Sequence, residues 1–282
     1  MSTRTSPPAA EPSVAALVLA GAPNRGPLAA VSDASYEALI EINGRPMIAY
    51  VLDALRQAPS VGRIGVVGPV AELRGVPEME GVELIAPVGG LLDNLERGAR
   101  VLQGENGDAG GKAVSGGRLL CVTSDIPLLT PAAVEDFLER CRTRDAASAR
   151  PGGLDAFYPM VNRAATRARF PGGRRTYVHL REGVFTGGNC VLLSPALLLK
   201  QRAIFDQAVA LRKDPVRMAR LLGLGFILKF LLRRLSAADI ERVVADKLGI
   251  HGAVIETPYA EIGFDVDKPD DLELARRMLA GE

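Results

Sequence analysis

The stretch from Arg118 to Pro131 places the strongest constraint on the fold, because an apolar run ends there at one carboxylate. Leu119 to Thr123 has the length and continuous apolar character of a strand that is buried on both faces of a parallel sheet. Open α/β sheets bind their ligands outside the C-terminal ends of their strands. Asp125 is therefore a candidate metal ligand, while a turn or capping role stays open because Thr130 and Pro131 begin a helix.

Other segments repeat this pattern of apolar strands and amphipathic helices. Val14 to Ala20, Arg63 to Gly68 and Val82 to Ala86 are predicted strands. Apolar residues recur at helical spacing over Pro46 to Gln57 and again from Pro131 to about Cys141. The alternation predicts an α/β fold in which helices flank a mostly parallel, twisted, Rossmann-like sheet.

The sequence predicts one domain over residues 14–282, after a disordered tail over residues 1–13 that is rich in Pro, Ser and Ala. Asp155 to Val161 is a predicted strand of different character, and Cys190 to Leu193 is another strand. Residues 195–248 are helical in pattern, which predicts a helical insertion near the C-terminus.

Composition excludes several classes of function. With 34 basic and 33 acidic residues, the net charge of +1 provides no general field for nucleic acid or an anionic membrane, so any anion site is local. The three cysteines are widely spaced and form no CxxC pair, which favours neither a disulfide framework nor a zinc site and fits the cytoplasm. No run reaches the roughly 18 to 20 apolar residues that span a bilayer.

Two glycine-containing loops are candidate ligand sites. Gly21 to Leu28 follows the first strand, where glycine lets backbone N–H groups approach an anion and Arg25 can pair with phosphates. A plain turn between strand and helix is the alternative. Gly89 and Gly90 precede a helix and can admit a base or a phosphate, or they can serve a loop that requires positive φ.

A third loop precedes the strand that begins at Cys190. Gly187, Gly188 and Asn189 are predicted to face a ligand, and Arg174 with Arg175 can receive a phosphorylated or carboxylated substrate. Paired arginines that are simply solvated are the alternative.

A second acidic cluster, Asp265 and Asp267, precedes the last helix. Asp270 and Asp271 lie in that helix's first turn, where they oppose the helix dipole and need no catalytic explanation. We expect Asp265 and Asp267 to alternate along an extended segment, so that only one of them faces Asp125, with Asp265 favoured.

The segment RLLGLGFILKFLLRRL, which ends at Leu235, is apolar nearly all round. This pattern predicts burial between helices or in a homo-oligomer interface. A membrane-surface contact through residues 221–235 is the alternative, given Lys229, Arg233 and Arg234.

The order of five motifs, LAGAPNR, INGRPMIAYVLDAL, VTSDIPLL, GGNCVLLSP and FDVDKPDDLELA, resembles the MobA-like nucleotidyltransferases. These are relatives of molybdenum cofactor and sugar-phosphate nucleotidyltransferases with a GT-A-like fold, and the match runs from Val14 to Leu279. The resemblance implies transfer of a nucleoside monophosphate from an NTP to a small phosphorylated acceptor or cofactor precursor, with release of pyrophosphate. It implies no nucleic acid partner.

The resemblance also implies site residues. Mg²⁺ would be held by Asp125 with Asp265 or Asp267, and Arg25 and Asp125 would be catalytic. The nucleotide would contact the loop after the first strand and the glycines before the second helix, that is Leu19, Ala20, Gly21, Ala22, Arg25, Pro87, Gly89, Gly90 and Asn94.

Two positions depart from the family pattern. Ala22 stands where members usually carry a second glycine, and Glu37 stands where they carry a lysine that faces the triphosphate. Arg25, Arg45 or Lys112 would then have to compensate for the reversed charge. Two alternatives follow: a nucleotide-sugar glycosyltransferase, in which residues 265–267 act as a DxD motif, and a non-catalytic nucleotide sensor.

Overall fold

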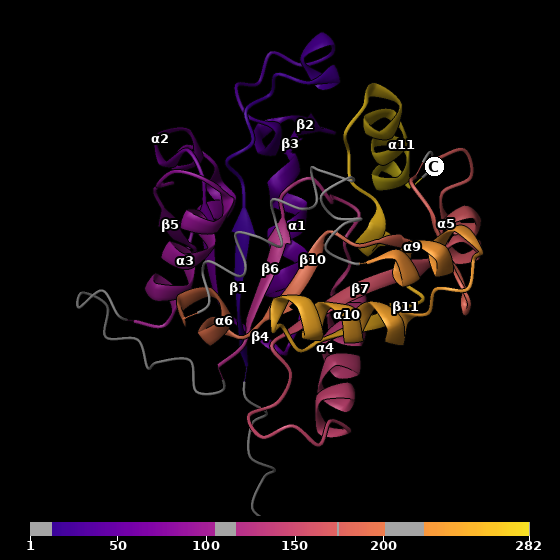
Figure 1. The fold of residues 1–282 in the computed structure, drawn as a ribbon. Helices are drawn as coiled ribbons and strands as arrows, with labels where there is room; N and C mark the ends of the chain where they lie inside the picture. Colours follow the sequence, from indigo (N-terminus) through magenta and orange to yellow (C-terminus); the bar gives the residue numbers. More distant parts are fainter. Residues whose placement is uncertain (1–12, 105–116, 174, 201–222, 282) are drawn as a thin grey trace, which may run out of the picture.

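The computed structural model of the chain describes residues 13–104, 117–173, 175–200 and 223–281 (Figure 1). Except for Ser13, the predicted tail lies outside these residues. The same is true of Lys112, Arg174 and residues 201–222 of the predicted insertion.

One mixed sheet forms the centre of the described fold (Figure 1). Its parallel core has the order β5-β4-β1-β6, and all four strands were predicted from sequence. The strands are β1 (Val14–Leu19), β4 (Val61–Val67), β5 (Glu83–Ile85) and β6 (Leu119–Thr123). Their C-terminal ends therefore lie along one edge of the sheet.

Beyond β6 the sheet is no longer parallel. The order continues β10-β7-β9-β8 with antiparallel pairs, and β11 pairs with β7 in parallel. These strands are β7 (Ala156–Asn162), β8 (Val178–Leu180), β9 (Gly183–Gly187), β10 (Cys190–Leu193) and β11 (Gly252–Thr257). The predicted α/β fold is confirmed, with its parallel character concentrated in the first half of the chain.

Helices cover both faces of the sheet, as the alternation along β1 requires. Ala16 and Val18 point to the side of α1 (Met47–Arg56) and α4 (Pro131–Ala146). Ala15 and Leu17 point to the side of α3 (Leu91–Leu102), α6 (Pro195–Lys200) and α10 (Ala237–Leu248). The described helices α6 and α10 of the predicted insertion thus contribute to the same apolar layer as α3.

Short elements complete the described chain. They are η1 (Pro27–Ala30), η2 (Glu37–Leu39), the hairpin β2 (Glu41–Ile42) and β3 (Arg45–Pro46), α2 (Val70–Leu73), η3 (Pro77–Met79), α5 (Arg163–Arg169), α9 (Leu224–Leu231), η4 (Ala260–Gly263) and α11 (Pro269–Ala280). None of the described helices has the length and apolar character that crossing a membrane requires.

Helix α4 begins where predicted but ends later. The Thr130 hydroxyl accepts a hydrogen bond from the Ala133 N–H (3.2 Å), which confirms the predicted cap. The helix runs to Ala146 rather than to Cys141, because no glycine or proline interrupts it and the i,i+3 pair between Glu139 and Arg142 supports its last turns.

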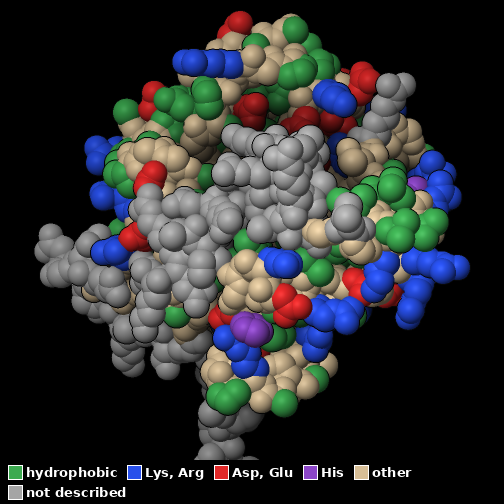
Figure 2. All heavy atoms as spheres, in the orientation of Figure 1, with side chains coloured by type: hydrophobic (Ala, Val, Ile, Leu, Met, Phe, Trp, Pro, Cys, Tyr) green, Lys and Arg blue, Asp and Glu red, His purple; other side chains and the backbone are tan. Residues whose placement is uncertain are grey.

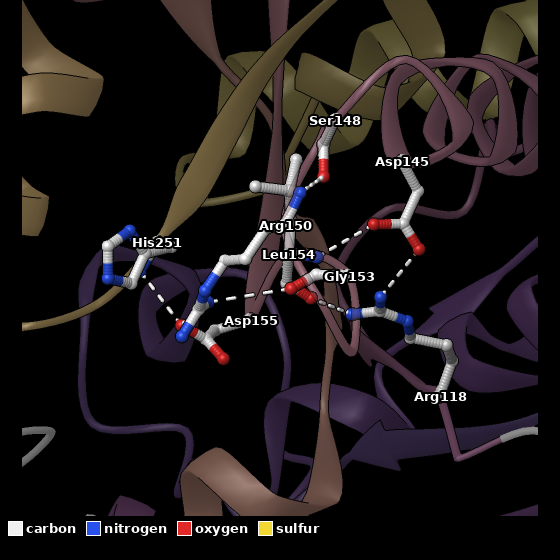
Figure 3. A network of polar contacts seen from close by, with 8 residues as sticks. All are labelled: Arg118, Asp145, Ser148, Arg150, Gly153, Leu154, Asp155 and His251. Carbon is white, nitrogen blue, oxygen red and sulfur yellow. Dashed lines mark hydrogen bonds and ion pairs between the residues drawn. The ribbon is translucent and has the colours of Figure 1, made fainter.

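A polar network fixes the loop that connects α4 to β7 (Figure 3). Arg118, just before β6, pairs with Asp145 (2.7 Å), whose other oxygen accepts the Leu154 N–H (2.7 Å). Asp155 accepts hydrogen bonds from the Arg150 guanidinium (2.7 Å) and from the His251 backbone N–H (2.9 Å). The network therefore ties the start of β7 to the starts of β6 and β11.

We predict that Asp145→Ala destabilises the protein by roughly 1–3 kcal/mol, because the half-buried Arg118 guanidinium loses its ion-pair partner and the Leu154 N–H loses its acceptor. Urea unfolding at constant m would measure the change. Glu139→Ala is the control, with an expected change below about 0.5 kcal/mol, because the Glu139 side chain is 64% exposed and forms only a surface ion pair. Equal midpoints for the two variants would contradict the prediction.

Candidate active site

The candidate site lies at the edge of the sheet where the parallel strands end. Two hydrogen bonds extend the ladder beyond the strands, from Ala20 N–H to the Val67 carbonyl (2.8 Å) and from Ser124 N–H to the Leu19 carbonyl (3.2 Å). The loop after β1 and the residues after β6 therefore begin side by side. This is the position at which open α/β sheets bind ligands.

Three carboxylates converge at this edge. Asp125, Asp265 and Asp267 each offer an oxygen, and these oxygens all lie within 4.8 Å of one another. Asp125 follows β6, and the other two lie between η4 and α11. The Val266 N–H donates to the Asp125 carbonyl (2.8 Å), which joins the two segments directly.

The expectation that only one of Asp265 and Asp267 faces Asp125 is wrong. Residues at i and i+2 of an extended segment share a face, and neighbours take the opposite one. Phe264 and Val266 are fully buried in the core, so Asp265 and Asp267 both lie on the side of Asp125. The alternation that was expected to separate the two acids brings them together.

Burial and mutual repulsion dominate the electrostatics of this cluster. Burial and the nearby Asp265 carboxylate raise the pKa of Asp125 above its ordinary value. Burial and the same neighbour raise the pKa of Asp267 to about 7. Asp125 Oδ1 is buried and accepts no hydrogen bond. Clustered carboxylate oxygens with an unpartnered buried oxygen are the donor set that a hard divalent cation such as Mg²⁺ prefers, so these residues fit the ion.

Arg175 is the buried cation beside the cluster. Its side chain is 8% exposed, and its Nη2 donates to the Asp265 carbonyl (2.5 Å) while its Nη1 lies 3.5 Å from Asp271 Oδ1. The guanidinium stacks on the Phe264 ring at 4.4 Å from the centroid. The solvated alternative is therefore wrong for Arg175, which orders the Asp265 segment. Its positive charge offsets a small part of the rise in the pKa of Asp125 and Asp267 that burial and the neighbouring carboxylates cause.

The loop after β1 is exposed to solvent, and side-chain hydrogen bonds to the following residues hold it in place. Gly21, Ala22 and Arg25 are exposed, and a Cβ built on Gly21 would meet no atom within 4 Å. The Asn24 side chain donates to the carbonyls of Ser32 and Ala34 (both 3.0 Å). Asn24 is thus an organising residue that sequence reasoning missed; its position inside the loop was the available signal.

Glu37 faces the same site. Its N–H donates to the Ala22 carbonyl (3.0 Å), and its Oε1 lies 3.9 Å from a Cβ built on Gly26. Burial and the Asp125 carboxylate raise the pKa of Glu37. Arg45 pairs with Asp53 (2.8 Å) and Glu78 (3.0 Å), so its charge is committed away from the loop.

The segment after β5 is an exposed turn that is stabilised by hydrogen bonds from its own residues and from the first turn of α3. Asn94 Oδ1 accepts the Val88 N–H (2.7 Å), and Asp93 caps the Gly90 N–H (2.8 Å). Gly89 has φ +94°, so its backbone conformation explains the glycine. Pro87 is exposed in the same turn, and Val88 is 43% exposed, which leaves apolar surface at this end of the edge.

The Gly187–Asn189 loop joins β9 to β10 in the chain, and its backbone forms hydrogen bonds with β6 and with η4. A Cβ on Gly188 would lie 2.6 Å from Ile262 Cγ2, so close packing explains that glycine. The Asn189 carbonyl accepts the Thr123 N–H (3.1 Å), and the Asn189 N–H donates to the Ile262 carbonyl (2.9 Å). The loop therefore lies next to the residues that carry the acidic cluster.

Comparison with known proteins agrees with this geometry. Residues 16–223 match the family model described as MobA-like NTP transferase domain. A hypothetical transferase from Thermus thermophilus is 36% identical with a TM-score of 0.76, over 92% of this chain and 99% of that one. No protein of curated function matches the chain.

Two more distant structures share the fold. A CMP:2-keto-3-deoxy-manno-octonic acid synthetase complexed with CTP is 17% identical with a TM-score of 0.58, over 95% of this chain and 98% of that one. A nucleotidyl transferase from Methanothermobacter thermautotrophicus is 16% identical with a TM-score of 0.52, over 96% of this chain and 99% of that one. With a family model that covers most of its length and nucleotidyltransferases as its structural neighbours, the chain belongs to the MobA-like NTP transferases.

Proposed function

We propose that the protein transfers a nucleoside monophosphate from an NTP to a small phosphorylated acceptor, with Mg²⁺ as cofactor and pyrophosphate as the second product. The observation that carries the proposal is the acidic cluster of Asp125, Asp265 and Asp267 beside the exposed Gly21–Arg25 loop. The buried, unpartnered Asp125 Oδ1 supports a bound cation at that position.

In this mechanism the backbone N–H groups of Gly21 and Ala22 and the Arg25 guanidinium would bind the triphosphate, and the three aspartates would hold Mg²⁺. The bound ion would neutralise phosphate charge. An oxygen of the acceptor phosphate forms the new bond to the α-phosphorus, the α–β bridging bond breaks, and its electron pair leaves with pyrophosphate. No protein nucleophile is required, since positioning and charge neutralisation supply the rate enhancement.

The base and the acceptor would occupy opposite ends of the edge. The turn containing Pro87, Gly89, Gly90 and Asn94 would contact the base, with Val88 as apolar surface. The Gly187–Asn189 loop would receive the acceptor, together with Arg174, which lies outside the described residues. Arg175 takes part through the Asp265 segment that it orders.

A non-catalytic nucleotide sensor is the second candidate, because the Glu37 carboxyl faces Asp125 and the phosphate loop. Isothermal titration with each of the four NTPs plus Mg²⁺, followed by assays of pyrophosphate release with phosphorylated acceptors, would test both functions. Binding without turnover would favour the sensor, and binding of none of the NTPs would contradict both.

We predict that Asp125→Asn lowers pyrophosphate release by about 10²-fold or more, because it removes a charged ligand of the cation. The same change should raise the melting temperature of the metal-free protein by a few degrees, since it removes a buried charge whose pKa is raised by burial and by the nearby Asp265 carboxylate.

Asp246→Asn, an exposed position on α10, is the matched control and should change neither quantity. Thermal scans with and without Mg²⁺ would make the measurement. Unchanged turnover in a folded Asp125→Asn protein would remove Asp125 from the mechanism.

We predict that Arg175→Gln lowers the melting temperature of the metal-free protein, because the clustered aspartates lose their buried cation. Added Mg²⁺ should then stabilise this variant more than the wild type, since the ion replaces the missing positive charge. Arg175→Lys keeps the positive charge but loses the planar guanidinium, so its melting temperature and its Mg²⁺-induced shift should lie between those of Arg175→Gln and the wild type. Equal Mg²⁺-induced shifts in all three proteins would show that Arg175 does not balance the cluster.

We predict that Glu37→Lys tightens NTP binding about ten-fold, because it replaces a carboxylate at the phosphate loop with a cation. Titration calorimetry with Mg²⁺-NTP would measure the change. Glu41→Lys, exposed on β2, carries the same charge change away from the loop and is the control. Weaker binding by Glu37→Lys would mean that the carboxylate itself contacts the nucleotide complex.

A further inference from the structure

Helix α9 (Leu224–Leu231) turns apolar side chains outward. Leu228, Leu231 and the next residue, Leu232, are 58%, 70% and 56% exposed and follow the i, i+3, i+4 spacing of a single helix face. Phe230 beside them is 47% exposed. The expectation that this segment is buried between helices is therefore wrong for the leucine face of α9.

The opposite side of α9 is anchored to the fold. Phe226 packs against a small buried cluster that contains Leu180, Phe185 and Leu235. Lys229 pairs with Asp239 at the start of α10 (2.7 Å). The helix is thus held in place by one face while its leucine face has no cover in the described part of the chain.

Basic residues border the leucine face. Arg233 follows Leu232 with φ +55°, a left-handed conformation that is uncommon for a residue other than glycine. Its N–H donates to the Phe230 carbonyl (3.0 Å), and the Arg234 N–H donates to the Lys229 carbonyl (2.7 Å), so the helix end is closed and both arginines stay beside the leucines.

The local charge is positive. Lys229 and Arg242 share the single carboxylate of Asp239, which leaves one excess positive charge. Arg233 and Arg234 are exposed and add two more. Figure 2, drawn in the orientation of Figure 1, shows basic and hydrophobic side chains side by side on the flank where α9 lies.

We propose that this surface, the leucine face of α9 with Arg233 and Arg234, docks on an anionic lipid bilayer. Exposed leucines that enter the headgroup boundary and a border of cations that contacts acidic headgroups are the two components of interfacial binding. A second protein is a poorer match, because three leucines and the neighbouring Phe230 on one short helix are few side chains for a stable interface, which buries ~800 Å² per partner. The bilayer needs no matching shape.

Vesicle sedimentation of the full chain would test the proposal. Vesicles of phosphatidylcholine with about one-third phosphatidylglycerol should bind the protein, and vesicles of phosphatidylcholine alone should bind it much more weakly. Binding should weaken as salt screens the arginines. Absence of binding to the anionic vesicles, or equal binding to both kinds, would overturn the proposal.

Variants separate the two components. Leu228→Ser with Leu231→Ser should lower the partition coefficient about ten-fold, because the apolar contact is lost. Arg233→Ser and Arg234→Ser should each lower it about five-fold on anionic vesicles. Val31→Ser, which is 46% exposed on η1's C-terminal side, and Arg74→Ser on the far flank are the matched controls and should bind like the wild type.

Light scattering tests whether a second copy of the chain, rather than a bilayer, covers this surface. A dimer that the paired leucine substitutions convert to a monomer, together with no vesicle binding, would assign the surface to a second copy of the chain and overturn the proposal. A mass that the substitutions leave unchanged, together with their loss of vesicle binding, would support it. All of these proteins are exposed-surface variants, and their melting temperatures should match the wild type.

Discussion

The hydrogen bond from the Val266 N–H to the Asp125 carbonyl joins two segments that lie 141 positions apart in the sequence, and the candidate site depends on it. Asp125 is delivered by a buried parallel strand. Asp265 and Asp267 come from an extended segment whose intervening residues, Phe264 and Val266, are buried in the core. This backbone contact fixes the position of the second segment relative to the end of β6. Oxygens of the three carboxylates therefore lie within 4.8 Å of one another.

Such a cluster is costly to a folded protein without a cation. Burial and like charge raise the pKa of Asp125, Asp267 and Glu37. Arg175 offsets part of this cost, and its side chain is held by Asp271 and by the Phe264 ring. The remaining imbalance favours a bound divalent ion, which is the connection between the stability of this edge and the proposed chemistry.

Sequence patterns were a good guide wherever local rules decide the structure. Strand β6 and the N-cap of α4 at Thr130 lie where the apolar run and the Thr-Pro pair predicted them. Patterns failed where a long-range contact decides. Arg175 has the sequence environment of a solvated loop arginine, yet it is buried because Phe264 and Asp271, about 90 positions later, surround it. Arg45 likewise pairs with Glu78, 33 positions later, and no local pattern could identify that partner.

The sequence by itself determined the α/β class and the parallel core strands, because strand period and helix spacing are properties of neighbouring residues. It also marked the three acidic residues as candidate metal ligands. Only the tertiary structure decided that all three acids share one site, that the second half of the sheet is largely antiparallel, and that the leucines of α9 face outward. These features depend on which distant segments pack together. An apolar helix face looks the same in the sequence whether a core, a partner or a bilayer covers it.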